Sequence, residues 1–119
     1  MKVSTAFVTL ASDNLQTLVE FYQQLLLQLP QSYVPERYAE FVLPGLTLAL
    51  FKPSQDSVAE FTGTASSMSL CLEVDNLEGA IATLTTIGYP PPGEIVHASH
   101  GQEIYAYDPA GNRLILHQS

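Results

Sequence analysis

Polar and apolar residues alternate on both sides of a turn-rich cluster near the end of the chain. Residues 101–118 read GQEIYAYDPAGNRLILHQ, and Asp108–Asn112 is the cluster between the two alternating runs. A period of two residues is typical of half-buried antiparallel strands. Because residues opposite each other on paired strands share a face, a loop over 108–112 gathers six residues on one face: Glu103, Tyr105, Tyr107, Arg113, Ile115 and His117. The other face, predicted to be core, carries Ile104, Ala106, Leu114 and Leu116.

The first half of the chain predicts a strand, then a helix, then a hairpin. Alternation over Val3–Ala11 predicts the strand, and Asp13–Gln16 has the form of a capping box in which Asp13 opens the helix. Apolar residues recur at helical spacing as far as Leu29, and Pro30 stops the helix. Residues 31–37 are predicted to be a loop, in which a further strand is only poorly patterned.

A Pro-Gly turn joins two strand-like runs, Tyr38–Leu43 and Leu46–Phe51. A two-residue turn fixes the register through three pairs: Leu43 with Leu46, Glu40 with Ala49, and Tyr38 with Phe51. Residues 53–67 are rich in small and polar side chains and are predicted to be a linker.

The same plan begins again after the linker. Met68–Asp75 alternates like a strand, with Leu70, Leu72 and Val74 on one side and Ser69, Cys71 and Glu73 on the other. Asp75–Glu78 is a second capping box, and an apolar helical stripe runs from Leu77 to Gly88. A Pro-Pro-Pro-Gly run at 90–93 blocks any continuation, and Glu94–Ser99 is a further strand candidate.

The tripeptide Asp-Asn-Leu marks this repetition, because it occurs at 13–15 and again at 75–77, each time between a strand and a helix. The preceding strand, the cap, the helical stripe and the later hairpin recur in the same order. We infer an α+β fold with two β-α-β-β-β modules. Module one spans 1–52, the linker 53–67 and module two 68–119, within one domain over 1–119.

The amino-acid composition argues against certain classes of binding partner. Twelve acidic and four basic residues give a net charge of −8, which repels phosphate backbones and anionic membrane surfaces, so neither nucleic acid nor a membrane is expected as a partner. The single cysteine, Cys71, excludes an internal disulfide and a multi-thiolate metal site. No signal-peptide pattern opens the chain, and a cytoplasmic location is expected.

Three stretches resemble the vicinal oxygen chelate superfamily, which includes glyoxalase I, extradiol dioxygenases, fosfomycin-resistance enzymes and bleomycin-resistance proteins. They are FVTLASDNLQTLVEFYQQLL at 7–26, SLCLEVDNLEGAIATLTTIG at 69–88, and the DPAGN turn with its following strand. The resemblance implies that the modules form a curved, mostly antiparallel sheet around a cleft. It also implies a homodimer, because superfamily members of this length are often homodimers.

The resemblance further implies where a metal would bind, because metal-dependent members take ligands from the first and last strands of each module. The first-strand positions fall on Phe7 and Ser69, and the last-strand positions fall on Ala49 and Ile115. None of these is a ligand that the superfamily uses, and Phe, Ala and Ile offer no lone pair. We therefore expect no metal and no cofactor.

Acidic and aromatic side chains are predicted to line the cleft. Carboxylates beside aromatic rings can hold a flat or cationic ligand by stacking and cation–π attraction. The alternative is that the aromatic residues only pack against their neighbours. The predicted ligand-binding residues are Phe7, Tyr38, Glu40, Phe51, Ser69, Glu73, Glu103, Tyr105, Tyr107, Arg113, Ile115 and His117.

Histidines and the cysteine allow further interpretations. Glu103 and His117 face each other and could be a general acid–base pair or simply a cross-strand contact. His97, His100 and His117 with Glu103 would be needed for a relocated metal site, and polar rim residues are the simpler alternative. No cation or helix start near Cys71 is evident, so an inert thiol is expected.

The sequence is compatible with three functions. The first is a metal-independent small-molecule-binding protein of the bleomycin-resistance type, which sequesters a cationic or aromatic ligand without catalytic residues. The second is an enzyme of the lyase, isomerase or dioxygenase type with a non-standard metal or acid–base site. The third is an interaction module whose cleft is vestigial and filled by Phe7, Phe51 and Ile115.

Overall fold

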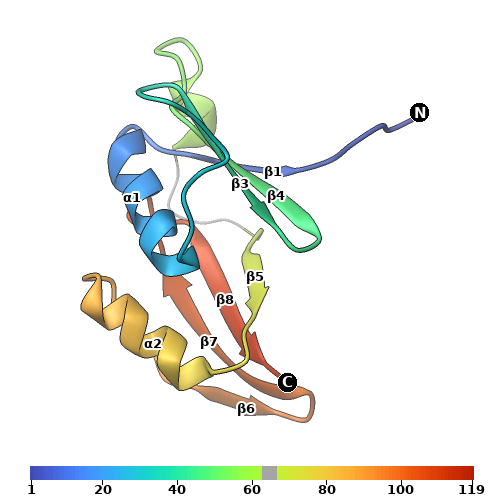
Figure 1. Ribbon diagram of the computed structural model, residues 1–119, viewed down its shortest axis with the longest axis vertical. Helices are drawn as coiled ribbons and strands as arrows, with labels where there is room; N and C mark the ends of the chain where they lie inside the picture. The colour runs from blue at the N-terminus through green and yellow to red at the C-terminus, as the bar shows by residue number, and fades with distance from the viewer. Residues whose placement is uncertain (63–66) are drawn as a thin grey trace. The chain divides into compact units, whose positions relative to one another are not determined.

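A computed structural model of the chain describes residues 1–62 and 67–119. The chain divides into two compact units, Met1–Thr62 and Gly63–Ser119, called the first and second units below. Each unit has the element order strand, helix, three strands (Figure 1). The predicted linker falls partly on residues 63–66, which lie outside the described residues. No helix among the described residues is long and apolar enough to cross a membrane.

The first unit contains a four-stranded mixed sheet in the order β1-β4-β3-β2. Strand β1 is parallel to β4, whereas β3 is antiparallel to both of its neighbours. Its elements are β1 (Val8–Ala11), α1 (Leu15–Leu26), β2 (Ser32–Val34), β3 (Tyr38–Leu43) and β4 (Leu46–Phe51), followed by a 3-10 helix (Val58–Phe61).

The second unit repeats this topology in the order β5-β8-β7-β6, again with one parallel pair, β5 with β8. Its elements are β5 (Leu70–Glu73), α2 (Leu77–Thr86), β6 (Val96–Ala98), β7 (Gly101–Tyr107) and β8 (Arg113–Gln118). The predicted α+β fold with two β-α-β-β-β modules is confirmed, and neither sheet closes into a barrel.

Both predicted hairpin registers are confirmed. In the first unit Glu40 pairs with Ala49 and Tyr38 with Phe51. In the second unit the pairs are Tyr107 with Arg113, Tyr105 with Ile115, and Glu103 with His117.

The helix caps lie one residue later than predicted. Asn14, and not Asp13, is the N-cap of α1, and its side chain accepts a hydrogen bond from the backbone N–H of Thr17. Asn76, and not Asp75, is the N-cap of α2, and its side chain accepts a hydrogen bond of 3.0 Å from the backbone N–H of Gly79. Asp and Asn are similarly good N-caps, so the Asp-Asn pair alone left the position ambiguous.

Other element ends also differ from the prediction. The first strand begins at Val8 and not at Val3, and α1 ends at Leu26, well before Pro30. Leu27 adopts the left-handed conformation with φ 54°, and the N–H of Gln28 bonds back to the carbonyl of Gln23, which closes the helix. The predicted loop at 31–37 contains β2, and the predicted linker contains the 3-10 helix.

Each helix packs its apolar stripe against the sheet of its own unit. Tyr22 of α1 meets Phe41 of β3 with ring centroids 6.5 Å apart, and α2 contacts β8. The second unit buries the residues predicted as its core, which are Ile104, Ala106, Leu114 and Leu116, together with Leu70, Leu77 and Leu84. Since strand side chains alternate, the residues between these positions point to the opposite face of the sheet.

Candidate functional site

Nine side chains of the second unit share the sheet face opposite the buried core, and we call this the outer face. The pairing of β5 with β8 and of β8 with β7 arranges them in three rows of three. The rows are Ser69, Arg113 and Tyr107; Cys71, Ile115 and Tyr105; and Glu73, His117 and Glu103. All eight predicted site residues of this half of the chain therefore lie on one surface, together with Cys71.

Arg113 ties the start of β5 to β8. Its Nε donates to Ser69 Oγ at 2.6 Å, and its Nη2 donates to the carbonyl of Met68 at 3.3 Å. A charge-assisted hydrogen bond of this length orients both side chains. Cationic charge is thus held beside the hydroxyl of Ser69.

Glu73 and His117 form a close pair across the parallel strands. The Nδ1 of His117 lies 2.5 Å from Glu73 Oε1, while Glu73 Oε2 accepts from the backbone N–H and the hydroxyl of Ser119, each at 2.8 Å. Hydrogen bonds from His117 and Ser119 lower the pKa of the Glu73 carboxyl to about 2, so it is ionised at neutral pH. The predicted contact of His117 with Glu103 is corrected, since its ring bonds to Glu73 instead.

Glu103 lies beside a different histidine. Its Oε1 is 3.7 Å from the Nε2 of His100, which belongs to the turn between β6 and β7. The His100 ring stacks on the His117 ring, with centroids 5.1 Å apart and 10° between the planes. Two histidines and two carboxylates therefore gather at one end of the outer face.

Tyrosine rings occupy the β7 edge of the outer face. Tyr105 is 47% exposed and Tyr107 is 39% exposed. Ile115 lies beside Tyr105, and the exposed Cys71 lies beyond it on β5. Partial burial and the nearby charges of Glu103 and Glu73 raise the pKa of the Cys71 thiol, which reduces its thiolate fraction.

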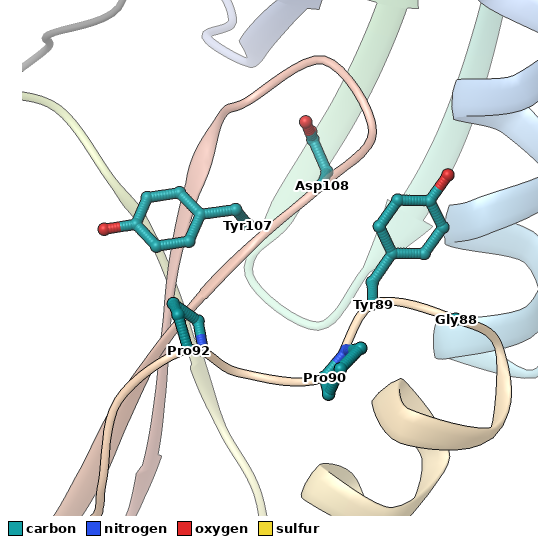
Figure 2. A pocket seen from close by; sticks show the side chains of 6 residues that line it. All are labelled: Gly88, Tyr89, Pro90, Pro92, Tyr107 and Asp108. Carbon is teal, nitrogen blue, oxygen red and sulfur yellow. The ribbon is translucent and has the colours of Figure 1, made fainter.

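A pocket of about 310 Å³ lies between the loop after α2 and the end of β7. Figure 2 shows the rings of Tyr89 and Tyr107 on opposite sides of it and the prolines along the loop. It is lined by Gly88, Tyr89, Pro90, Pro92, Tyr107 and Asp108. Of these residues, only Tyr107 is predicted from the sequence as a site residue, because a run of prolines by itself indicates only that a helix ends.

Asp108 lines the pocket, but its carboxylate makes hydrogen bonds within the turn. One carboxylate oxygen accepts from the N–H groups of Ala110 and Asn112, each at 2.9 Å, and the other accepts from the side chain of Asn112 at 2.8 Å. The residue is buried, so its charge is matched within the loop.

The predicted site residues of the first unit lie on β3, β4 and the segment before β1. Tyr38 donates a short hydrogen bond to Glu40, which raises the pKa of the Tyr38 phenol, and Tyr38 pairs with Phe51. The Phe51 ring meets that of Phe61 edge to face at 5.0 Å. Phe7 precedes β1 and is 51% exposed.

The positions at which the superfamily places metal ligands do not suit a metal here. Ala49 is 0% exposed and has no donor atom, and Phe7 and Ile115 likewise offer none. Ser69 has a hydroxyl, but that oxygen accepts from the Arg113 guanidinium, whose charge opposes a second cation. Across residues 1–62 and 67–119, no group of three or more His, Cys, Asp or Glu side chains is placed to hold a metal ion.

The sequence matches the model of the Glyoxalase/Bleomycin resistance protein/Dioxygenase superfamily over residues 5–116. The chain belongs to this superfamily, which confirms the resemblance seen in its repeated motifs. No curated protein matches the sequence.

Solved structures share the fold at low sequence identity. The bleomycin-binding protein in complex with bleomycin is 19% identical, with a TM-score of 0.70 and coverage of 98% of this chain and 99% of that chain. Lactoylglutathione lyase from Agrobacterium tumefaciens is 19% identical, with a TM-score of 0.75 and coverage of 99% and 96%. A genomically encoded fosfomycin resistance protein from Listeria monocytogenes is 16% identical, with a TM-score of 0.78 and coverage of 100% and 95%.

Proposed function

We propose that the protein binds a flat, cationic small molecule on its outer face without using a metal. The observation that carries the proposal is the column of side chains on β7, in which Tyr107, Tyr105 and Glu103 follow one another on the same face. Alternate residues of a strand are about 7 Å apart. A ligand ring against a tyrosine can therefore place a positive group beside the carboxylate.

Charge supports a cationic ligand. Glu73 is ionised and Glu103 lies in the same row, while the chain as a whole carries a net charge of −8. A cation over an exposed aromatic ring gains about 0.5–1 kcal/mol, and more when water is excluded. The pocket beside Tyr107 offers further ring surfaces to an aromatic ligand.

The set of donor atoms at the superfamily's ligand positions supports the proposed metal independence. The superfamily includes proteins that bind a ligand, as the structure with bleomycin illustrates, as well as enzymes. Here the ligand positions hold Phe7, Ala49 and Ile115, and the hydroxyl of Ser69 is taken by Arg113. Sequestration of a ligand therefore fits the chain better than metal-dependent conversion.

An acid–base enzyme is the second candidate, because the Glu73–His117 pair is a carboxylate-oriented imidazole. Such an enzyme would convert a substrate, and its turnover would depend on both Glu73 and His117. Sequestration predicts that the bound compound is recovered unchanged.

Titration calorimetry with a quaternary ammonium probe, trimethyl(naphthylethyl)ammonium, tests the proposal. We expect binding by the wild-type protein and about fivefold weaker binding by Tyr105→Ala, from the lost cation–π and stacking energy. Tyr33→Ala is the matched control, since Tyr33 is 40% exposed on β2. A naphthalene sulfonate of the same size should not bind. An equal loss of affinity in Tyr105→Ala and Tyr33→Ala, or no binding by the wild-type protein, would contradict the proposal.

A homodimer in the cytoplasm is also part of the proposal. The homodimer rests on the resemblance to superfamily members of this length, and the location rests on the single cysteine. Light scattering coupled to gel filtration should give twice the chain mass of 13.0 kDa. A mass of one chain at micromolar concentration would exclude the homodimer.

A further inference from the structure

The ring of His117 is held in one orientation. Its Nδ1 lies 2.5 Å from an oxygen of Glu73, and the second Glu73 oxygen is fixed by two hydrogen bonds from Ser119. An ionised carboxylate can only accept, so the proton in this contact is on Nδ1. When His117 is neutral, its other nitrogen, Nε2, therefore carries a lone pair.

That lone pair has no hydrogen-bond partner within residues 1–62 and 67–119. Among the described residues, the Nε2 of His117 is a buried polar atom without a hydrogen-bond partner. Buried polar atoms are nearly always paired, and each exception calls for an explanation such as a ligand or a catalytic role. A carboxylate on one imidazole nitrogen is also the arrangement that orients the other nitrogen toward a substrate or ligand.

An exposed side chain covers one face of the His117 ring. The ring of His100 stacks on that of His117, yet the His100 side chain is 64% exposed and belongs to a turn. Its contact with Glu103 spans 3.7 Å, longer than a hydrogen bond. A ligand cation that approaches Glu103 competes directly with His100 for this carboxylate.

We propose that His117 Nε2 accepts a hydrogen bond from an ammonium N–H of the ligand, while Glu103 supplies the opposing charge and His100 is displaced. This inference rests on the proposed function and narrows its ligand to an aromatic compound with a protonated primary or secondary amine. Tyr105 is two residues from Glu103 on the same face, so the ring and the ammonium group of such a compound are about 7 Å apart.

Only one charge state of His117 can accept a hydrogen bond from the ammonium group. Protonation places a hydrogen on Nε2, which turns the acceptor into a donor and adds a positive charge. The groups that face the ring are Glu73 and Cys71 from β5, Glu103 from β7 and His100 from the turn. The neutral imidazole is therefore the form that accepts the ammonium N–H.

Two probes with the same ring test the inference. Naphthylethylammonium has N–H donors, whereas its trimethyl derivative has none. The wild-type protein should bind the first about tenfold more tightly, as for a hydrogen bond with a charged partner. His117→Asn keeps an N–H that reaches Glu73 but has no counterpart of Nε2, so the two affinities should become equal. His97→Asn, on β6, should keep the tenfold preference.

The outcomes separate this inference from the proposed function. Equal affinities of the wild-type protein for both probes, with loss in Tyr105→Ala, would overturn only the role of His117. Absence of binding by either probe would overturn both. Imidazole nitrogen NMR of the wild-type protein avoids dependence on a folded variant: the resonance of unprotonated Nε2 should shift with the ammonium probe alone. A shift with both probes, or with neither, would contradict the inference.

Discussion

Arg113 Nε donates a hydrogen bond of 2.6 Å to the hydroxyl of Ser69, the position where the resemblance places the first metal ligand of the second module. The guanidinium thus engages the hydroxyl group at this position. The contact also links β8 to the residue before β5. Loss of this contact should therefore lower the free energy of unfolding.

Arg113→Met should lower the free energy of unfolding by about 1–2 kcal/mol, because it removes the hydrogen bonds to Ser69 and to the Met68 carbonyl. Urea denaturation measures the difference. Arg37→Met is the matched control, as this exposed arginine lies in the loop between β2 and β3. Equal effects of the two substitutions would argue against a specific role for the Ser69 contact.

Glu73 makes stability depend on pH. Its carboxyl has a folded-state pKa of about 2 against an ordinary value of 4.5, so its contribution is present above about pH 4.5 and is lost as the pH falls toward 2. Glu73→Gln should show a smaller drop in melting temperature than the wild type over this range. Glu94→Gln, at an exposed loop position, should follow the wild-type curve. Parallel curves for wild type and Glu73→Gln would refute the assignment.

Cys71 should alkylate slowly at neutral pH despite its exposure. Burial and the charges of Glu103 and Glu73 raise its thiol pKa, and the thiolate is the reactive form. Glu103→Gln removes one of these charges, so the rate of reaction with iodoacetamide should increase. Glu94→Gln again serves as the control. An unchanged rate in Glu103→Gln would show that its charge does not act on the thiol.

The cap of α2 can be assigned by two neighbouring substitutions. Asn76→Ala removes the hydrogen bond to the Gly79 N–H and should cost about 1 kcal/mol of stability. Asp75→Ala should have a smaller effect, because Asn76 is the N-cap. Thermal unfolding of both variants gives the comparison, and a larger loss in Asp75→Ala would reverse the assignment.

Registers and faces were predictable because they depend on local rules. With a period of two, the two-residue turn at 44–45 was enough to pair Glu40 with Ala49, and a loop over 108–112 was enough to pair Tyr105 with Ile115. The cap position was not predictable, since Asp75 and Asn76 are both good N-caps and the choice depends on backbone geometry.

The partner of His117 required tertiary information. Glu103 was the expected partner because the two residues face each other in a hairpin, yet Glu73 reaches the ring from the parallel strand β5. Parallel pairing joins segments distant in sequence, and no local pattern specifies it. The pocket beside Tyr107 was missed for the same reason, because the loop after α2 meets the end of β7 only in the folded unit.

Thermal unfolding of chelator-treated protein tests the central claim, metal-independent binding, most directly. A ligand that binds only the native state adds about 2.7 kcal/mol of stability at a hundredfold excess over its dissociation constant. Trimethyl(naphthylethyl)ammonium should raise the midpoint, whereas nickel, zinc, manganese and iron ions should leave it unchanged. A rise with one of these metals, or a response to the probe that appears only after metal is restored, would contradict the account.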